Sequence, residues 1–169
     1  YMLAGWRKRD TKSNEAGLKY YLMGVFATGI FLYGFSLLYG VSGSTNLGEI
    51  SRAIGKGDAP SSIVVVALVL SIIGFGFKVS AVPFHAWAPD TYEGAPTPIT
   101  AFLAVASKAA GFAALIQLVF IGFAERADVV QPLMFILAAL SMTVGNLIAI
   151  RQTNVVRMLA YSGIAQAGF

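Results

Sequence analysis

Long apolar runs alternate with short polar segments along this chain. A transmembrane helix needs about 20 consecutive apolar residues. Four runs meet that length, at residues 16–38, 61–84, 99–123 and 129–150. Shorter runs at 1–6 and 158–169 are interpreted as parts of two further spans that the ends of the sequence cut short. The pattern predicts an all-α, polytopic transmembrane helix bundle, with residues 1–169 forming a single membrane-domain fragment.

A short amphipathic segment lies between the first two spans. Asn46, followed three residues later by Glu49, has the spacing of a capping box. Apolar Leu47, Ile50 and Ile54 then fall on the opposite face from Glu49, Arg52 and Lys56. The segment is therefore predicted to form a short helix along the membrane interface.

Composition supports a membrane protein and limits its chemistry. Hydrophobic residues make up 57% of the chain and charged residues 12%, whereas soluble domains are about a quarter charged. The absence of cysteine excludes thiolate-held iron–sulfur clusters, and a single histidine cannot supply two imidazoles to a haem. We expect no redox cofactor, no metal site and no nucleic-acid partner for this chain. Asp90 and Glu93 are interpreted as caps of the turn before Pro96.

Basic residues are unevenly divided between alternate loops. Six lie on one side and three on the other: Arg7, Lys8, Arg9, Lys12, Arg151 and Arg157 against Arg52, Lys56 and Arg126. Because short cytoplasmic loops hold the excess of Lys and Arg, the first side is predicted to be cytoplasmic.

Two lysines, Lys78 and Lys108, lie inside predicted spans. Lysine at mid-bilayer costs at least about 2.5–3.5 kcal/mol, so each needs a reason to be there. Each is nine residues from the same membrane surface, which places it about 13 Å deep. A buried lysine can gain and lose a proton at physiological pH, which suits a proton relay. The alternatives are a static salt bridge or a side chain that reaches the interface.

Pro83, with Gly74 and Gly76 before it, predicts a broken or kinked helix next to Lys78. Broken helices at membrane depth often line an ion path, although a purely structural kink is the alternative. His85 lies two residues after Pro83. It could be the point where protons enter from water, or an ordinary structural hydrogen-bonding residue.

Three stretches of the chain resemble one protein family. They are FKVSAVPFHAWAPDTYEGAPTPITAFLAVAS from Phe77, followed by Lys108; EAGLKYYLMGVFATGIFLYG from Glu15; and GNLIAIRQTNVVRMLAYSGIAQAGF from Gly145. They resemble the antiporter-like membrane subunits of complex I, the respiratory NADH–quinone oxidoreductase, over nearly the whole chain.

The resemblance implies an antiporter-like fold of fourteen helices, with two inverted five-helix repeats that each hold a broken helix. Lys78 matches the lysine before the break in that family, and Lys108 matches its relay lysine. The glutamate partner and the third lysine of the family lie outside this chain. Gln166 stands where related sequences often have histidine, and glutamine cannot carry a proton step.

The function implied by the resemblance is proton transport driven by NADH oxidation and quinone reduction. NADH, FMN, iron–sulfur clusters and quinone would then belong to the parent complex. The expected partners are other membrane subunits and the lipid bilayer, in the inner (plasma) membrane of a bacterium. Two alternatives remain open: a cation/proton antiporter or membrane-bound hydrogenase subunit of the same superfamily, and a passive scaffold subunit.

Overall fold

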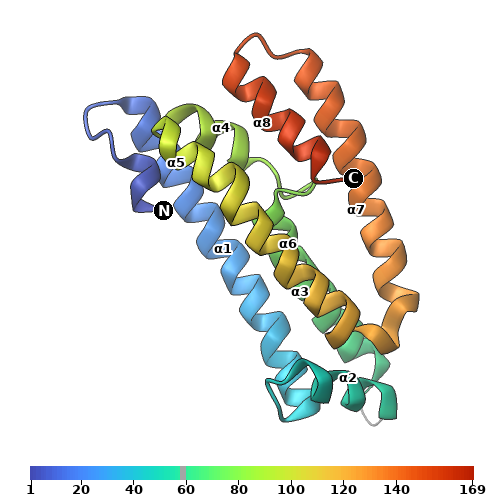
Figure 1. Ribbon diagram of the computed structural model, residues 1–169. Helices are drawn as coiled ribbons and strands as arrows, with labels where there is room; N and C mark the ends of the chain where they lie inside the picture. The colour runs from blue at the N-terminus through green and yellow to red at the C-terminus, as the bar shows by residue number, and fades with distance from the viewer. Residues whose placement is uncertain (58–59) are drawn as a thin grey trace.

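The computed structural model describes residues 1–57 and 60–169, and all regular structure in these ranges is helical. Figure 1 shows an elongated bundle of long helices crossed at one end by α2. The elements are η1 Met2–Gly5, α1 Thr11–Ser42, α2 Leu47–Lys56, α3 Ser61–Val79, α4 Trp87–Gly94, α5 Thr97–Phe102, η2 Leu103–Ser107, α6 Lys108–Gln117, η3 Leu118–Gly122, η4 Ala124–Arg126, α7 Ala127–Ile150 and α8 Val155–Gln166. Of the short elements, η2 and η3 are π-helical, and η1 and η4 are 3₁₀ turns.

Four helices are long and apolar enough to cross a membrane, as the hydrophobic pattern predicted: Thr11–Ser42, Ser61–Val79, Thr97–Gly122 and Ala124–Ile150. The first is longer than its apolar run. Its start is set by Asp10, whose side chain accepts a 3.0 Å hydrogen bond from the Lys12 N–H, and its end by Gly43 at φ 67°. Polar end turns extend a helix without adding to the hydrophobic run, which explains the difference.

The second span ends earlier than predicted, at Val79 instead of residue 84. Ser80 adopts a left-handed conformation at φ 62°, which ends the helix. The Ala81 N–H then donates to the Gly76 carbonyl at 2.8 Å, and the Ser80 N–H donates to the Phe77 carbonyl at 3.1 Å. The predicted break near Pro83 is confirmed, but it begins three residues before the proline.

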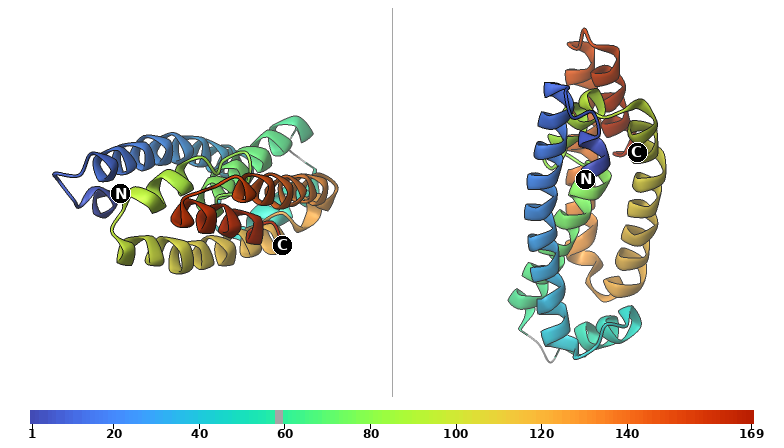
Figure 2. Two further views of the ribbon diagram at one scale, coloured as in Figure 1. Left: turned by 90° about the horizontal axis from the view of Figure 1, so that it is seen from above. Right: turned by 90° about the vertical axis from the view of Figure 1, so that its left-hand side faces the viewer.

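The short helix α4 follows this break and packs between α1 and α8 (Figure 2). Around it lies a cluster of buried apolar side chains that includes Tyr20, Phe77, Trp87 and Ile164. A second cluster at the other end of the bundle joins α2 to the long helices through Ile50 and Ile54. The predicted short helix is therefore present, and the Asn46 side chain caps it by accepting from the N–H groups of Gly48 and Glu49.

Small residues bring two pairs of helices into backbone contact. A Cβ atom added at Gly145 of α7 would lie 2.8 Å from the Ala165 nitrogen of α8, and one at Gly34 of α1 would lie 2.9 Å from the Ser71 nitrogen of α3. Ser141, Gly145 and Ala149 are small residues spaced four apart on α7, and the close contact at Gly145 is of the kind that small residues allow between helices in lipid.

Candidate functional site

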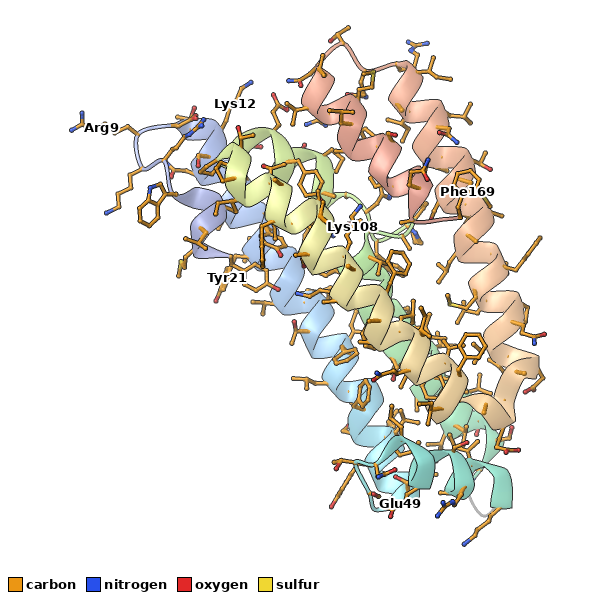
Figure 3. All side chains as sticks on the ribbon, in the orientation of Figure 1. Arg9, Lys12, Tyr21, Glu49, Lys108 and Phe169 are labelled. Carbon is orange, nitrogen blue, oxygen red and sulfur yellow. The ribbon has the colours of Figure 1, made fainter. Side chains whose placement is uncertain are left out.

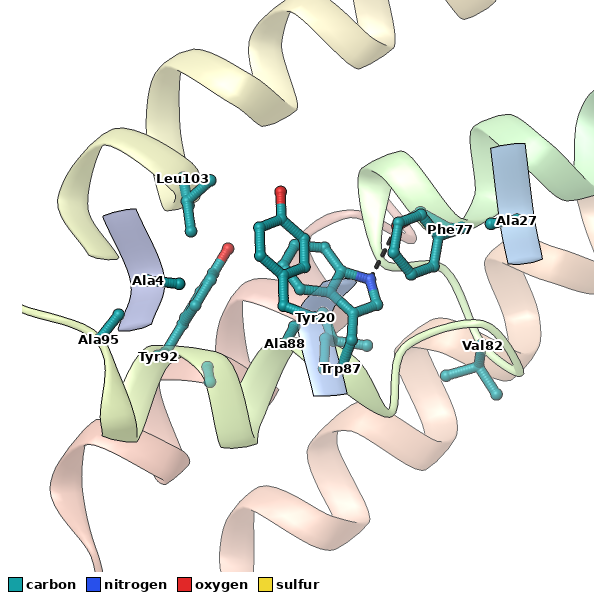
Figure 4. Close-up of a cluster of buried hydrophobic side chains, with 12 residues drawn as sticks. Ala4, Tyr20, Ala27, Phe77, Val82, Trp87, Ala88, Tyr92, Ala95 and Leu103 are labelled. Carbon is teal, nitrogen blue, oxygen red and sulfur yellow. Dashed lines mark hydrogen bonds between the residues drawn. The ribbon is translucent and has the colours of Figure 1, made fainter. Parts of the chain in front are cut away.

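Trp87 holds the broken end of α3 in place. Its indole Nε1–H donates to the Phe77 carbonyl at 2.9 Å (Figure 4), which gives a partner to a carbonyl at the end of the helix. The indole also stacks on Tyr20 of α1, with ring centroids 4.7 Å apart. The break is thus built from bonds to neighbouring elements, as is required of irregular backbone at membrane depth.

Lys108 is the most buried charged residue of the site. Its side chain is 8% exposed, and its ammonium donates to the Gly163 carbonyl of α8 at 3.1 Å. The elements α5, η2, α6 and η3 form one continuous helix, Thr97–Gly122, which we call the α5–α6 helix. Figure 3 shows Lys108 between this helix and α8. It has no salt bridge to a carboxylate in the described part of the chain. Among the described residues its charge faces the Gly163 carbonyl and the Tyr92 ring, whose centre is 5.9 Å from the Nζ atom.

The helix that carries Lys108 is irregular directly before it. Residues Leu103–Ser107 form a π-helical turn, and Lys108 is the first residue of α6. Such π-helical turns within α-helices occur frequently at functional sites. The hydrophobic pattern predicted one continuous helix here and gave no signal of this turn.

A cavity of about 510 Å³ opens beside Lys108, between the α5–α6 helix and α8. Most of its lining is apolar, and its polar groups include Thr97, Thr100 and Gln166. This volume is large enough to hold several waters, each of which occupies about 30 Å³ in the liquid. The site therefore has room for water next to a buried ammonium, with Thr97, Thr100 and Gln166 as polar groups around it.

Lys78 lies on the neighbouring helix α3 but in a different environment. Its side chain is exposed on the surface of this chain, beside a cavity of about 220 Å³ that is also lined by Tyr1, Thr28 and Phe31. The stem of Lys78 lies near Gly111, since a Cβ atom added there would be 3.5 Å from its Cγ. Gly111 is three residues, or about one helical turn, from Lys108, so the stem of Lys78 packs against α6 close to Lys108.

His85 lies in the loop between α3 and α4, next to exposed Pro83. Its ring is 6.2 Å from that of Tyr161 on α8. The His85 Nδ1 atom is buried and has no hydrogen-bond partner among the described residues. His85 thus belongs to the same broken segment as Lys78, although no hydrogen bond among the described residues joins it to either lysine.

Asp90 and Glu93 do not cap a turn, and that interpretation is wrong. Asp90 pairs with Lys19 of α1 at 2.7 Å and with Arg157 of α8 at 2.6 Å, while Glu93 pairs with Lys12 at 2.9 Å and with Arg157 at 3.1 Å. Both carboxylates lie on α4, on the face where α1 and α8 approach it. We call these four pairs the α4 clasp.

The clasp keeps both acids ionised. Burial opposes the charge of Asp90, but hydrogen bonds from Lys19 and Arg157 outweigh it and lower the pKa of the Asp90 carboxyl. Hydrogen bonds from Lys12 and Arg157 lower the pKa of Glu93. No group of three or more His, Asp or Glu side chains in the described ranges could hold a metal ion.

The two sets of basic residues lie at opposite ends of the bundle. The start of α1 and the α7–α8 turn both lie at the end that holds α4, whereas α2 and the start of α7 lie at the other end (Figure 1). The grouping used for the topology prediction is therefore kept in three dimensions.

Fold and site define this chain as part of a polytopic helical membrane protein with a buried cationic residue beside a broken helix. The sequence family described as "NADH:quinone oxidoreductase/Mrp antiporter, TM" matches residues 1–169, and the chain belongs to this family.

Comparison with known proteins finds relatives among NADH- and NAD(P)H-quinone oxidoreductase subunits, and a structural neighbour in the membrane-bound sulfane sulfur reductase, an archaeal respiratory membrane complex, with a TM-score of 0.86 and 31% identity over 99% of this chain and 34% of that one. The chain is 49% identical over its whole length to NADH-quinone oxidoreductase subunit N of Trichlorobacter lovleyi, covering 35% of that protein. It is 55% identical to NAD(P)H-quinone oxidoreductase subunit 2 of Nostoc punctiforme, again over its whole length and 32% of the relative. A chain of respiratory complex I from Thermus thermophilus matches with a TM-score of 0.78 and 41% identity, over 95% of this chain and 34% of that one. The resemblance found in the sequence is confirmed, and the chain spans about a third of the length of these relatives.

Proposed function

We propose that this chain is part of a proton-translocating membrane subunit of a respiratory NADH–quinone oxidoreductase, in which Lys108 and Lys78 relay protons. The names of the relatives support membership of an NADH–quinone oxidoreductase complex, and the surroundings of Lys108 support its role in a proton relay. In this proposal the energy comes from NADH oxidation and quinone reduction elsewhere in the complex. NADH, FMN, iron–sulfur clusters and quinone are bound by other parts of it, and this chain carries no redox centre.

The observation that carries the proposal is the environment of Lys108. A lysine fixed for structure alone is expected to have a carboxylate partner, because an unpaired buried charge is strongly destabilising. Lys108 instead bonds one carbonyl, beside a cavity that can hold water, in the described chain. An ammonium placed in this way can pass a proton to water and take it back.

The remaining residues have subordinate roles in the proposal. Lys78 exchanges protons with Lys108 through water, and His85 is the point where protons enter the broken segment. The exposed face of Lys78 is available for a further part of the subunit. The partners are other membrane subunits and lipid, and the location is the inner membrane of a bacterium.

A monovalent cation/proton antiporter of the same family is the alternative function, since the family description includes the Mrp antiporters. Such a protein, or a membrane-bound hydrogenase subunit, could use the same lysines with another energy source. Co-purification with flavin and iron–sulfur subunits separates these from the proposal. A passive scaffold is the alternative without transport, and it predicts unchanged pumping when both lysines are neutralised.

The test uses the full-length subunit in its complex, in native membranes. Lys108→Ala is expected to reduce quinone-coupled proton pumping at least tenfold while the complex assembles. Lys108→Arg should reduce pumping in the same way, because a guanidinium group keeps its proton at any physiological pH. Lys56→Ala, at the exposed end of α2, is the matched control and should pump normally.

A structural role for Lys108 predicts the opposite result. Arginine would then substitute well, and alanine would lower the yield of assembled complex. Near-normal pumping by Lys108→Arg together with poor assembly of Lys108→Ala would refute the relay.

A further inference from the structure

An aromatic ring faces the buried ammonium of Lys108. The Lys108 Nζ atom lies 5.9 Å from the centre of the Tyr92 ring, which is within the distance at which a ring face attracts a cation. Tyr92 also lines the cavity beside Lys108. The same ammonium donates to the Gly163 carbonyl at 3.1 Å. The two groups come from different helices, α4 and α8.

Tyr92 is held firmly enough to act as a fixed support. It is 5% exposed, and Trp87 packs edge-on against its ring with centroids 6.1 Å apart. Its backbone carbonyl accepts a 3.1 Å hydrogen bond from the Thr100 hydroxyl of α5, the helix that leads to Lys108. Figure 4 shows Tyr92 on α4, on the side of Leu103. The ring is thus tied both to the break and to the helix that carries the lysine.

The Tyr92 hydroxyl does not compete with the ring for the ammonium. It is buried and has no hydrogen-bond partner among the described residues, Lys108 included. Burial raises the pKa of this hydroxyl, so it stays protonated and brings no negative charge to the site. The ring face is therefore the part of Tyr92 that meets the charge.

We propose that Tyr92 is a positioning residue for Lys108: its ring face holds the charged ammonium against α8 and favours the protonated form of the lysine. The relay of the proposed function is assumed here, and Tyr92 deepens it by controlling the geometry and charge state of one lysine. Tyr92 itself transfers no proton. Because it lies on α4, a movement of the segment after the break would change the surroundings of Lys108.

Two substitutions separate the ring from the hydroxyl. In the full-length subunit within its complex, Tyr92→Phe keeps the ring and should retain at least half of the quinone-coupled pumping. Tyr92→Leu removes the ring and should reduce pumping about fivefold or more. Tyr33→Leu is the matched control, because Tyr33 of α1 is 59% exposed and lies outside the site.

The pH profile supplies a readout that a packing defect would not move. Without the ring the charged form of Lys108 is less favoured, so the alkaline limb of the pumping profile of Tyr92→Leu should shift to lower pH. The profile of Tyr92→Phe should not shift. Equal behaviour of the two variants, normal or impaired, would overturn the inference, and so would a loss in Tyr92→Leu without a shifted profile.

Lys108→Ala, measured in parallel, separates this inference from the proposed function. Normal pumping by Lys108→Ala would refute the proposed relay, and the inference about Tyr92 would be refuted with it. Loss of pumping in Lys108→Ala together with a normal Tyr92→Leu leaves the relay in place and overturns only the role of Tyr92.

Discussion

The backbone N–H of Val82 donates a 2.9 Å hydrogen bond to the Ser141 hydroxyl, which joins the loop after α3 to the middle of α7. The same hydroxyl donates to the Leu137 carbonyl at 2.6 Å, and Ser141 is fully buried. One side chain thus satisfies a backbone group of the break from a helix about 60 residues away in the sequence. The break is consequently a tertiary feature, and Pro83 is only one part of it.

Ser141→Ala should weaken the break. It removes the acceptor of a buried N–H, and an unsatisfied buried group of this kind costs about 1–3 kcal/mol. We expect a lower thermal midpoint of the assembled complex and slower pumping. Thr143→Ala, on an exposed position of the same helix, is the control. If both variants have the same midpoint and rate, the hydrogen bond has no measurable role.

Pro83→Ala should have a smaller effect than Ser141→Ala. The helix already ends at Val79, and the bonds from Ala81, Val82 and Trp87 that fix the break do not use Pro83. Pumping should fall less than twofold, and the complex should assemble. A Pro83→Ala variant that loses pumping while Ser141→Ala keeps it would show that the proline itself makes the break.

Asp90→Asn should loosen α4 from its neighbours. Asp90 bonds cations on both α1 and α8, and its side chain is 27% exposed, so these pairs are better shielded from water than ordinary surface pairs. A cysteine at buried Thr91 should then react faster with a thiol reagent. Asp128→Asn is the control. It removes the ion pair between Arg126 and Asp128, whose side chain is 64% exposed, and it should leave the labelling rate of the cysteine unchanged. Equal labelling in the two variants would contradict a holding role for the clasp.

The α4 clasp should also make stability depend on acid pH. The pKa values of Asp90 and Glu93 lie below their ordinary values of about 4. Their contribution is therefore complete above about pH 5 and is lost as pH falls through the lowered values. The cations that face them, Lys12, Lys19 and Arg157, stay charged throughout this range.

The measurement is the thermal midpoint of the complex between pH 7 and pH 3, compared with that of an Asp90→Asn, Glu93→Gln double variant. The thermal midpoint of the double variant should be lower at pH 7 and should decrease less on acidification to pH 3. A parallel decline of both proteins would assign the acid sensitivity to other groups.

Topology can be tested with two cysteines, at Lys8 and at Lys56. The excess of basic residues predicts that the first faces the cytoplasm and the second the opposite side. An impermeant thiol reagent should label them from opposite sides of the membrane in the full-length subunit. Labelling of both from one side would contradict the arrangement of spans.

The sequence by itself determined the apolar spans, the short amphipathic helix between the first two of them, and the two unusual lysines. Each depends on a local property: the length of an apolar run, the 3.6-residue period of Ile50 and Ile54, or a charge within an apolar segment. Such properties hold whatever the neighbouring helices do, because lipid and water alone impose them.

Only the tertiary structure decided where α3 ends, how Lys108 and Lys78 differ, and what Asp90 does. The end of α3 depends on Trp87 and Ser141, the burial of Lys108 on a carbonyl of α8, and the ionisation of Asp90 on cations from two other helices. Hydrogen bonds and ion pairs act over a few ångströms in space, between residues far apart in the chain. No periodicity or composition of the sequence records which of them will meet.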